Sequence, residues 1–196
     1  MHAHLVLAHP LADSLNAHLA QRAQAALEGR GVIVDRLDLY AEAFQPCLSA
    51  EERQGMQTKR PVDTDVAALQ ARLGAADMLV LVFPTWWFSM PSILKGWFDR
   101  VWTPGFAYKP GTPIQPRLRQ LQSVLVVTTL GSPWWVDYLV MRRPVRRVLK
   151  LALMGACAPQ ARFAMLSLHG AEAVDAKQTA RFGARLDAAI ARLVPR

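Results

Sequence analysis

The sequence has few cysteines and no long hydrophobic run. Two cysteines, Cys47 and Cys157, occur in 196 residues, without a Cys-x-x-Cys pair or the Cys/His spacing of metal ligands. We therefore expect no structural metal, and a reducing cytoplasm is the simplest compartment. No apolar run approaches the roughly 20 residues of a membrane-spanning helix. The N-terminus, MHAHLVLAHP, lacks the basic region of a signal peptide, so we expect no membrane insertion.

The motifs of two common nucleotide-binding loops are absent as well. Neither GxGxxG nor GxxxxGKS/T occurs, so the sequence supports neither a Rossmann pyrophosphate loop nor a P-loop ATP site. It also has no internal repeat, low-complexity tract or dividing linker. With 52% hydrophobic and 19% charged residues, the composition is that of a globular protein. We expect one domain over residues 1–196 with a full hydrophobic core.

Acidic residues are outnumbered in this chain. The 23 lysines and arginines stand against 15 aspartates and glutamates, which gives a formal net charge of +8. Because no nucleic-acid-binding module or basic arm is recognisable, we expect no nucleic-acid partner. The densest basic cluster is predicted to be a solvated helix face or, alternatively, to attract an anionic dinucleotide. This cluster consists of Arg142, Arg143, Arg146, Arg147 and Lys150.

Short apolar runs alternate with segments of helical period. The apolar runs predict strands at His2–Ala8, Val32–Leu37, Asp77–Phe83, Ser123–Leu130 and Arg162–Leu168. The periodic segments predict helices at Asp13–Leu27, Val62–Leu73, Pro91–Val101, Trp135–Leu153 and Asp175–Leu193. Tyr40–Arg60 has no strong period and predicts a long excursion with a short helix at Ala50–Gly55. This alternation is typical of βαβ units, which build a parallel sheet with helices on both faces.

Local signals mark where some helices begin and end. Asp13 or Ser14 is expected to cap the first helix, and Gly29 to end it. Pro144 predicts a kink or restart in the long segment 135–153. Gly155 is expected to stop that segment.

Five parallel strands of this length favour an α/β flavodoxin-like doubly wound sheet with strand order 2-1-3-4-5. In that order the first and third strands are neighbours, and the winding direction reverses between them. Ligands of open α/β sheets bind above the carboxyl ends of the strands at such a switch point. We therefore expect the binding site where three loops, after the first, third and fourth strands, meet.

The first of these loops leads into the N-terminus of a helix. Free amides and the positive end of the helix dipole favour a phosphate there. Ser14 and Asn16 add side-chain donors, and His9 can donate a further hydrogen bond. The alternative is that Asp13 or Ser14 only caps the helix and that Asn16 is solvated.

The second loop is rich in aromatic residues. Segment Phe83–Tyr108 contains four of the six tryptophans, and it begins where a buried strand ends in Pro84-Thr85-Trp86-Trp87-Phe88. Flat rings beside free backbone amides suit a planar heteroaromatic ligand such as a flavin. The alternative is a hydrophobic loop that packs into the core or a subunit interface.

The third loop, Thr128-Thr129-Leu130-Gly131-Ser132, carries small residues and hydroxyls. These allow a ring to approach the backbone closely, and the amides there can bond to flavin oxygens and nitrogens. The alternative is an ordinary strand end with a glycine turn.

Four sequence motifs together match a known pattern. The most specific is PxxWFxxPxILKGWFxRVxxxxFAY, which runs from Pro84 to Tyr108. The others are Leu7-Ala8-His9-Pro10 with Ser14 and Asn16, Asp38-Leu39-Tyr40, and Thr128-Thr129 with Gly131. By these motifs the chain resembles the NAD(P)H:quinone reductase family, the DT-diaphorase-like flavoproteins with a flavodoxin-like fold. The resemblance covers about residues 4–168.

This resemblance implies a flavoprotein oxidoreductase, an NAD(P)H dehydrogenase acting on quinones. NAD(P)H would reduce the flavin by hydride transfer to N5, and a quinone or similar acceptor would then take two electrons in a ping-pong cycle. The flavin phosphates would be held by His9, Ser14, Leu15 and Asn16. The ring would be lined by Pro84, Thr85, Trp86, Trp87 and Phe88, and its edge contacted by Thr128, Thr129 and Gly131.

The chain departs from the family pattern after the third loop. The family has a tyrosine and a histidine shortly after this loop, which are thought to steady charge on the reduced flavin. Here Leu130 replaces a glycine and no histidine follows nearby in the sequence, so we expect Tyr138 and Trp87 to act in catalysis, with Arg142 as an alternative source of positive charge. The first loop favours FAD slightly over FMN. The long C-terminal extension of the larger members is missing.

Members of the family are typically homodimers with the active site at the interface. An aromatic set would suit that interface, although core packing is the alternative for its members. The set is Trp97, Phe98, Trp102, Phe106 and Tyr108. Two other functions fit the same fold: a regulatory flavoprotein subunit that binds a potassium efflux system in the membrane, and an azo- or nitroreductase.

Overall fold

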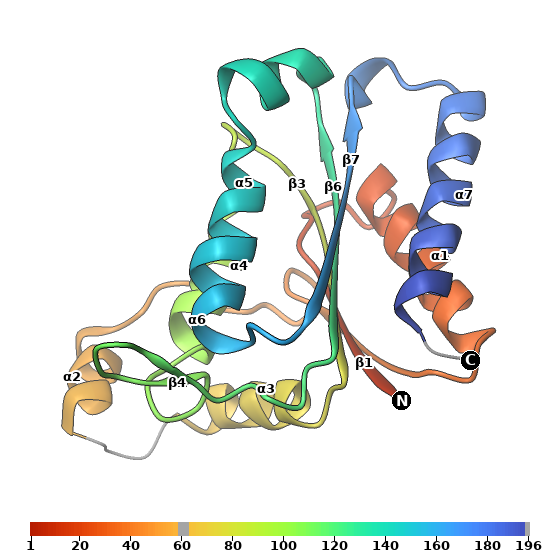
Figure 1. The fold of residues 1–196 in the computed structure, drawn as a ribbon. Helices are drawn as coiled ribbons and strands as arrows, with labels where there is room; N and C mark the ends of the chain where they lie inside the picture. The colour runs from red at the N-terminus through yellow and green to blue at the C-terminus, as the bar shows by residue number, and fades with distance from the viewer. Residues whose placement is uncertain (59–62, 195–196) are drawn as a thin grey trace.

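A five-stranded parallel sheet forms the centre of the computed structural model, which describes residues 1–58 and 63–194 (Figure 1). The order β2-β1-β3-β6-β7 confirms the predicted order 2-1-3-4-5. Because each strand pairs in parallel with its neighbours, all carboxyl ends lie at one edge. The strands are β1 His2–Leu7, β2 Ile33–Asp38, β3 Met78–Pro84, β6 Ser123–Leu130 and β7 Arg162–His169.

Helices cover both faces of the sheet, as predicted. On one face α1 (Leu15–Glu28) and α7 (Ala176–Leu193) lie side by side, and on the other lie α3 (Thr64–Gly74) and α4 (Ser92–Val101) (Figure 1). Each layer encloses its own core of buried apolar side chains. The two central strands, β3 and β6, are buried at every residue, which explains their continuous apolar sequence.

The remaining elements are short. Two strands that the sequence did not predict form an antiparallel hairpin in the proline-rich loop, β4 Tyr108–Lys109 and β5 Gln115–Pro116. The short helical elements are α2 Ala50–Thr58, α5 Pro144–Arg147, α6 Gly155–Cys157, the π-helical η1 Val136–Val140 and η2 Val148–Met154, and the 3-10 helix η3 Ala171–Ala173. Val62, the predicted start of a helix, and Arg60, the predicted end of the excursion, lie outside the described residues.

Most predicted helix boundaries are correct to within about two residues. Ser14, not Asp13, caps α1: its hydroxyl accepts the Ala17 amide at 3.1 Å. The helical segment restarts at Pro144, as predicted. The expected stop at Gly155 is wrong, because Gly155 has right-handed helical dihedrals and the chain stays helical to Cys157.

A charged cluster ties β1, β2 and α3 together at the edge of the core. The His4 ring, fully buried, donates from Nδ1 to Asp35 at 2.8 Å, and the Arg72 guanidinium bonds both Asp35 and Glu42. The hydrogen bond from His4, followed by that from Arg72, holds the pKa of Asp35 well below its usual range. Asp35 therefore stays ionised at neutral pH, and its bonds to His4 and Arg72 join α3 to β1 and β2.

The aromatic set predicted as a dimer interface belongs instead to the core. Trp97, Phe98 and Trp102 are buried and pack edge to face, with ring centroids 5.0–6.1 Å apart. Phe106 and Tyr108 are partly buried and pack against the same cluster. The alternative of intrachain packing is the correct one, because α4 turns its apolar face toward the sheet.

A close contact makes Gly96 a sensitive position of the fold. A Cβ atom there would lie 2.2 Å from the Pro46 carbonyl oxygen and 2.4 Å from the Pro46 Cβ. We predict that Gly96→Ala destabilises the protein by about 1–3 kcal/mol through overpacking, although alanine is the better helix former. Gly155→Ala is the matched control, because the nearest atom to its Cβ is 3.7 Å away. Thermal unfolding measures both, and equal melting temperatures would contradict this packing.

Candidate functional site

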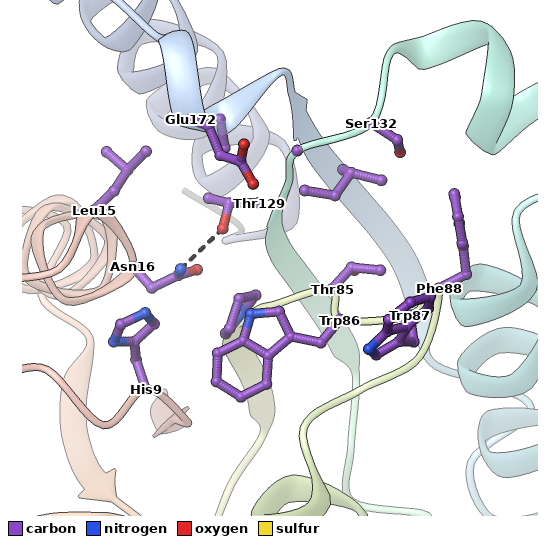
Figure 2. Close-up of a pocket in the computed structure, with 14 residues that line it drawn as sticks. His9, Leu15, Asn16, Thr85, Trp86, Trp87, Phe88, Thr129, Ser132 and Glu172 are labelled. Atoms are coloured by element: carbon purple, nitrogen blue, oxygen red, sulfur yellow. Dashed lines mark hydrogen bonds between the residues drawn. The ribbon is translucent and has the colours of Figure 1, made fainter.

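A cleft of about 610 Å³ opens above the carboxyl ends of β1, β3 and β6 (Figure 2). It lies at the predicted switch point, between the loops that leave β1 and β3. Its walls come from these two loops, from the loop after β6 and from the turn after β7. The lining residues are His9, Leu15, Asn16, Pro84, Thr85, Trp86, Trp87, Phe88, Thr129, Leu130, Gly131, Ser132, Ala171 and Glu172.

The N-terminus of α1 forms one wall. The amides of Leu15 and Asn16 lie in the first turn, where no helical carbonyl can accept them. Asn16 is only 3% exposed, and its Nδ2 donates to the Thr129 hydroxyl at 2.9 Å. Its Oδ1 is buried without a partner among the described residues. Buried polar atoms are normally hydrogen-bonded, so an unpaired acceptor beside free amides indicates a site where a polar ligand supplies the missing partner.

His9 adds a donor to this wall. His9 Nδ1 lies 3.0 Å from the Leu11 amide nitrogen and 3.3 Å from the Leu11 carbonyl oxygen, so this side of the ring is held by the backbone of the first loop. The ring lies 6.2 Å from that of Trp86, centroid to centroid. Figure 2 shows His9 below Asn16, on the cleft side of the first loop.

The aromatic loop forms the opposite wall. Trp86 and Ser89 exchange two backbone hydrogen bonds, of 3.0 and 2.9 Å, and so close a tight turn. The two residues between them, Trp87 and Phe88, have φ of 50° and 54°, a conformation that is strained for bulky side chains. Trp87 is 98% exposed, and neither central amide donates a hydrogen bond within residues 1–58 and 63–194. The turn thus presents an aromatic face and two free donors.

The third wall is the end of β6. The Thr85 amide donates to the Thr129 carbonyl at 2.7 Å, and the Thr85 and Thr128 hydroxyls bond at 2.8 Å. These contacts join the second and third loops. Gly131 follows, where a Cβ would lie 2.8 Å from Glu172 Oε1, so glycine permits the turn after β7 to close over this wall.

Most of the predicted cofactor-contacting residues line the cleft, but two do not. Ser14 is the helix cap rather than a lining residue, and Thr128 lies behind the rim, 1% exposed, against Thr85. The Ser14 hydroxyl bonds the Ala17 amide, and the Thr128 hydroxyl bonds that of Thr85. Leu130 and Ser132 of the third loop also line the cleft, and the lining residues that the sequence missed are Ala171 and Glu172.

Tyr138 lies outside the cleft and has an unexpected neighbour. Its ring, 43% exposed, packs 5.9 Å from the His169 ring and 4.3 Å from the Arg143 guanidinium carbon. His169 Nε2 in turn lies 3.2 Å from the Asp137 carboxylate. No histidine follows this loop nearby in the sequence, but β7 pairs with β6 and places His169 opposite Leu130.

A second, larger cavity of about 1390 Å³ lies beside α2 and the β4–β5 hairpin. Its lining includes Cys47, Glu52 and Arg100, and the last two are paired at 2.7 Å. None of the predicted site residues lines it. Because it lies away from the switch point, we take the first cleft as the candidate site.

A family model described as the flavodoxin-like fold matches residues 1–186. The chain belongs to this flavodoxin-like family. The cleft thus lies where ligands bind in such folds.

Similar proteins agree with this assignment. An uncharacterized NAD(P)H oxidoreductase of Escherichia coli (strain K12), YcaK, is 40% identical over 109 residues, covering 55% of this chain and 56% of that protein. NAD(P)H dehydrogenase (quinone) 1 of Rattus norvegicus is 36% identical over 149 residues, covering 65% and 53%. The chain thus spans about half the length of the curated relatives it matches.

One solved structure aligns over nearly its whole length. The NAD(P)H:quinone oxidoreductase from Methanothermobacter marburgensis has a TM-score of 0.86 at 27% identity, covering 100% of this chain and 97% of that one. The resemblance to NAD(P)H:quinone reductases that the sequence motifs predict is confirmed by these relatives.

In this flavodoxin-like chain, the contact between Asp137 and His169 is expected to hold the segment 136–143 in place. The amides of Met141 and Arg143 donate to the carbonyls of Val136 and Asp137, so the segment is closed on itself. We predict that His169→Ala speeds hydrogen exchange of these two amides about tenfold or more, because a hydrogen bond to a charged group is lost.

The matched control is His18→Ala, an exposed histidine on α1. Exchange measured by NMR or mass spectrometry should be unchanged in that variant. Unchanged exchange in both variants would mean that His169 does not hold the segment.

Proposed function

We propose that this protein is a flavin-dependent NAD(P)H:quinone oxidoreductase, with residues 1–196 as one flavin-binding domain. The observation that carries the proposal is the cleft itself. Free amides of a helix N-terminus, an exposed aromatic turn and a small-residue strand end face one cavity at the switch point. The names of the relatives, NAD(P)H dehydrogenase (quinone) and NAD(P)H:quinone oxidoreductase, support the same activity.

The residues present fit a flavin. Asn16 offers an unpaired buried acceptor, and the cavity of about 610 Å³ lies within the usual range of cofactor sites. We assign the phosphate to the side of His9, Leu15 and Asn16, where donors gather and no acidic residue occupies the first turn of α1. The aromatic loop, together with Thr129 and Gly131, would then hold the ring. The slight preference for FAD over FMN stays a prediction.

A bound flavin would supply two-electron chemistry, carrying a hydride equivalent from NAD(P)H to a quinone. The residues of this chain bind, orient and shield it. His9 and the α1 amides would donate to the anionic end, and the free amides of Trp87 and Phe88 would donate to ring acceptors. The exposed Trp87 ring can cover a planar substrate. Ser14 and Thr128 act indirectly, by fixing α1 and Thr85.

The first test is the absorbance of the purified protein. We predict visible flavin bands that bleach when NADH or NADPH is added without oxygen and return when a soluble quinone is added. Asn16→Ala should weaken flavin binding about tenfold, because its hydrogen bonds at the cleft are lost. Gln24→Ala is the control, since Gln24 bonds Glu28 at the other end of the same helix.

Two results would contradict the proposal. One is a protein that takes up neither FAD nor FMN. The other is a flavin-loaded protein that reacts with neither NADH nor NADPH. Reduction by NAD(P)H without transfer to quinones would instead favour an azo- or nitroreductase, which differs only in the electron acceptor, or a regulatory subunit.

We also propose that the protein is a homodimer, through a surface other than the one predicted from the sequence. Large apolar side chains are exposed on and beside η1, which follows the third loop. We call them the η1 patch: Trp134, Trp135, Leu139, Val140 and Met141. Apolar side chains gathered on a surface in this way mark interaction sites. A second copy there would cover the η1 patch beside the cleft.

The oligomeric state tests this surface. We predict a dimer in sedimentation analysis for the wild-type protein and a monomer for Leu139→Glu, because a charge would be buried at the contact. Ile33→Glu is the control: Ile33 is exposed to a similar extent, 62% against 67%, but lies on β2. A monomeric wild-type protein, or a dimer that Leu139→Glu leaves intact, would contradict the proposal.

Membrane and compartment follow from separate observations. No helix in the described part of the chain is long and apolar enough to cross a bilayer. Cys47 and Cys157 are free thiols, and burial raises the pKa of Cys157 to about 11. The free thiols support the cytoplasmic location expected from the sequence.

A further inference from the structure

The helical segment after η1 carries positive charge that no nearby acidic residue in the sequence balances. Residues 138–171 contain neither aspartate nor glutamate, but they contain five arginines and one lysine. Arg143 is set apart from the others, because its guanidinium stacks on the Tyr138 ring. Four of the remaining cations are clustered on and beside α5: Arg142, Arg146, Arg147 and Lys150.

These four side chains have no anionic partner in the described part of the chain. None of them forms an ion pair or a side-chain hydrogen bond within residues 1–58 and 63–194. Elsewhere Arg22, Arg72 and Arg100 each pair with a carboxylate at 2.7–2.9 Å. Of the four, only Arg146 is half-buried, and the others are exposed. Their charge is therefore available to an anionic partner outside the chain.

Apolar side chains are exposed between these cations. Val148 follows Arg147 and is 45% exposed. Leu151 follows Lys150 and is 64% exposed. The opposite side of the segment is buried in the core on the sheet face that carries α3 and α4 (Figure 1). We call the outer side the basic face: Arg142, Arg146, Arg147, Val148, Lys150 and Leu151.

Arginine and lysine interleaved with exposed aliphatic side chains are the combination that binds anionic lipid surfaces. The cations attract the lipid phosphates, and the aliphatic side chains enter the boundary of the acyl chains. A nucleic acid would satisfy the charges but would offer no apolar layer to Val148 and Leu151. We propose that the basic face docks this protein on the surface of a bilayer that contains anionic phospholipids.

This docking is compatible with the proposed dimer contact. The basic face begins after Met141, the last residue of the η1 patch, so the two surfaces share no residue. The inference does not depend on whether the cleft binds a flavin. For the proposed quinone reductase, docking would bring the protein to the phase in which hydrophobic quinones dissolve.

Co-sedimentation with lipid vesicles tests the proposal. One set of vesicles is pure phosphatidylcholine, and the other contains equal parts of phosphatidylcholine and phosphatidylglycerol. The basic-face variant carries three changes to glutamine: Arg146→Gln, Arg147→Gln and Lys150→Gln. The matched control removes the same number of charges from exposed positions of α7, on the other face of the sheet: Lys177→Gln, Arg181→Gln and Arg185→Gln. Melting temperatures check that both variants fold.

We expect the wild-type protein and the α7 control to bind the anionic vesicles and not the neutral ones. The basic-face variant should bind about a hundredfold more weakly, since each cation near an anionic surface contributes about fivefold to the affinity. Binding should also fall at about 1 M salt, where the Debye length is about 3 Å. No binding to anionic vesicles, or an equal loss in the α7 control, would overturn the proposal.

Leu151→Gln separates a lipid surface from other polyanions. It should weaken vesicle binding about tenfold, because an apolar side chain no longer enters the bilayer, and leave the weaker binding to a DNA duplex unchanged. Vesicle binding that Leu151→Gln does not change would mean attraction by charge alone. Tighter binding to the duplex than to the vesicles would assign the basic face to nucleic acid. Either result would overturn docking on a bilayer.

Discussion

The parallel pairing of β1 with β3 is the constraint on which the rest of this site depends. Leu7 lies opposite Val82, and the Ala8 amide continues the ladder to the Val82 carbonyl at 2.9 Å. β1 therefore ends opposite Val82, close to the end of β3 at Pro84. From there the chain leaves β1 for α1 on one face and β3 for α4 on the other (Figure 1). Because the two helices leave in opposite directions, a crevice opens between their loops.

A rigid base supports a strained and incompletely bonded rim. The cores on both faces of β3 and β6 exclude water, whereas the rim holds two non-glycine residues with positive φ, an almost fully exposed tryptophan and an unpaired buried amide oxygen at Asn16. Backbone strain costs about 1–3 kcal/mol per residue and persists only where the surroundings enforce it. Here the Trp86–Ser89 hydrogen bonds and the bond between Thr85 and Thr129 enforce it. Such a rim is formed before the ligand arrives, which lowers the free energy needed to order it on binding.

Much of this fold could be predicted from the sequence because its signals are local. The apolar run Ser123–Leu130 is bounded as predicted, and the alternation of strands and helices predicted the fold class, from which the strand order was deduced. The two-residue strands β4 and β5 were not predictable, because they depend on pairing rather than on pattern. Gly155 continues its helix because neighbouring turns fix right-handed dihedrals there, although glycine commonly ends helices.

The loops that form the site could be predicted from the sequence, but which of their side chains line the cleft could not. His9 lies in the loop after β1, Asn16 in the first turn of the helix that follows, and Pro84–Phe88 at the end of β3, so the strand order brings them together. The partner of each side chain was not predictable. Ser14 bonds the Ala17 amide and Thr128 bonds the Thr85 hydroxyl, and neither lines the cleft. Residues after β7 were missed because only the pairing of β6 with β7 brings that turn beside the third loop. Glu172 and His169 both enter the region in this way.

The central claim is that a flavin occupies the cleft above β1 and β3. A crystal structure of the protein with bound FAD or FMN tests it most directly. We predict that the phosphate binds at the amides of Leu15 and Asn16, and that the ring lies against Trp86, Trp87 and Phe88. A flavin bound instead in the larger cavity beside α2, near Arg100, or with its ring away from the aromatic turn, would contradict it.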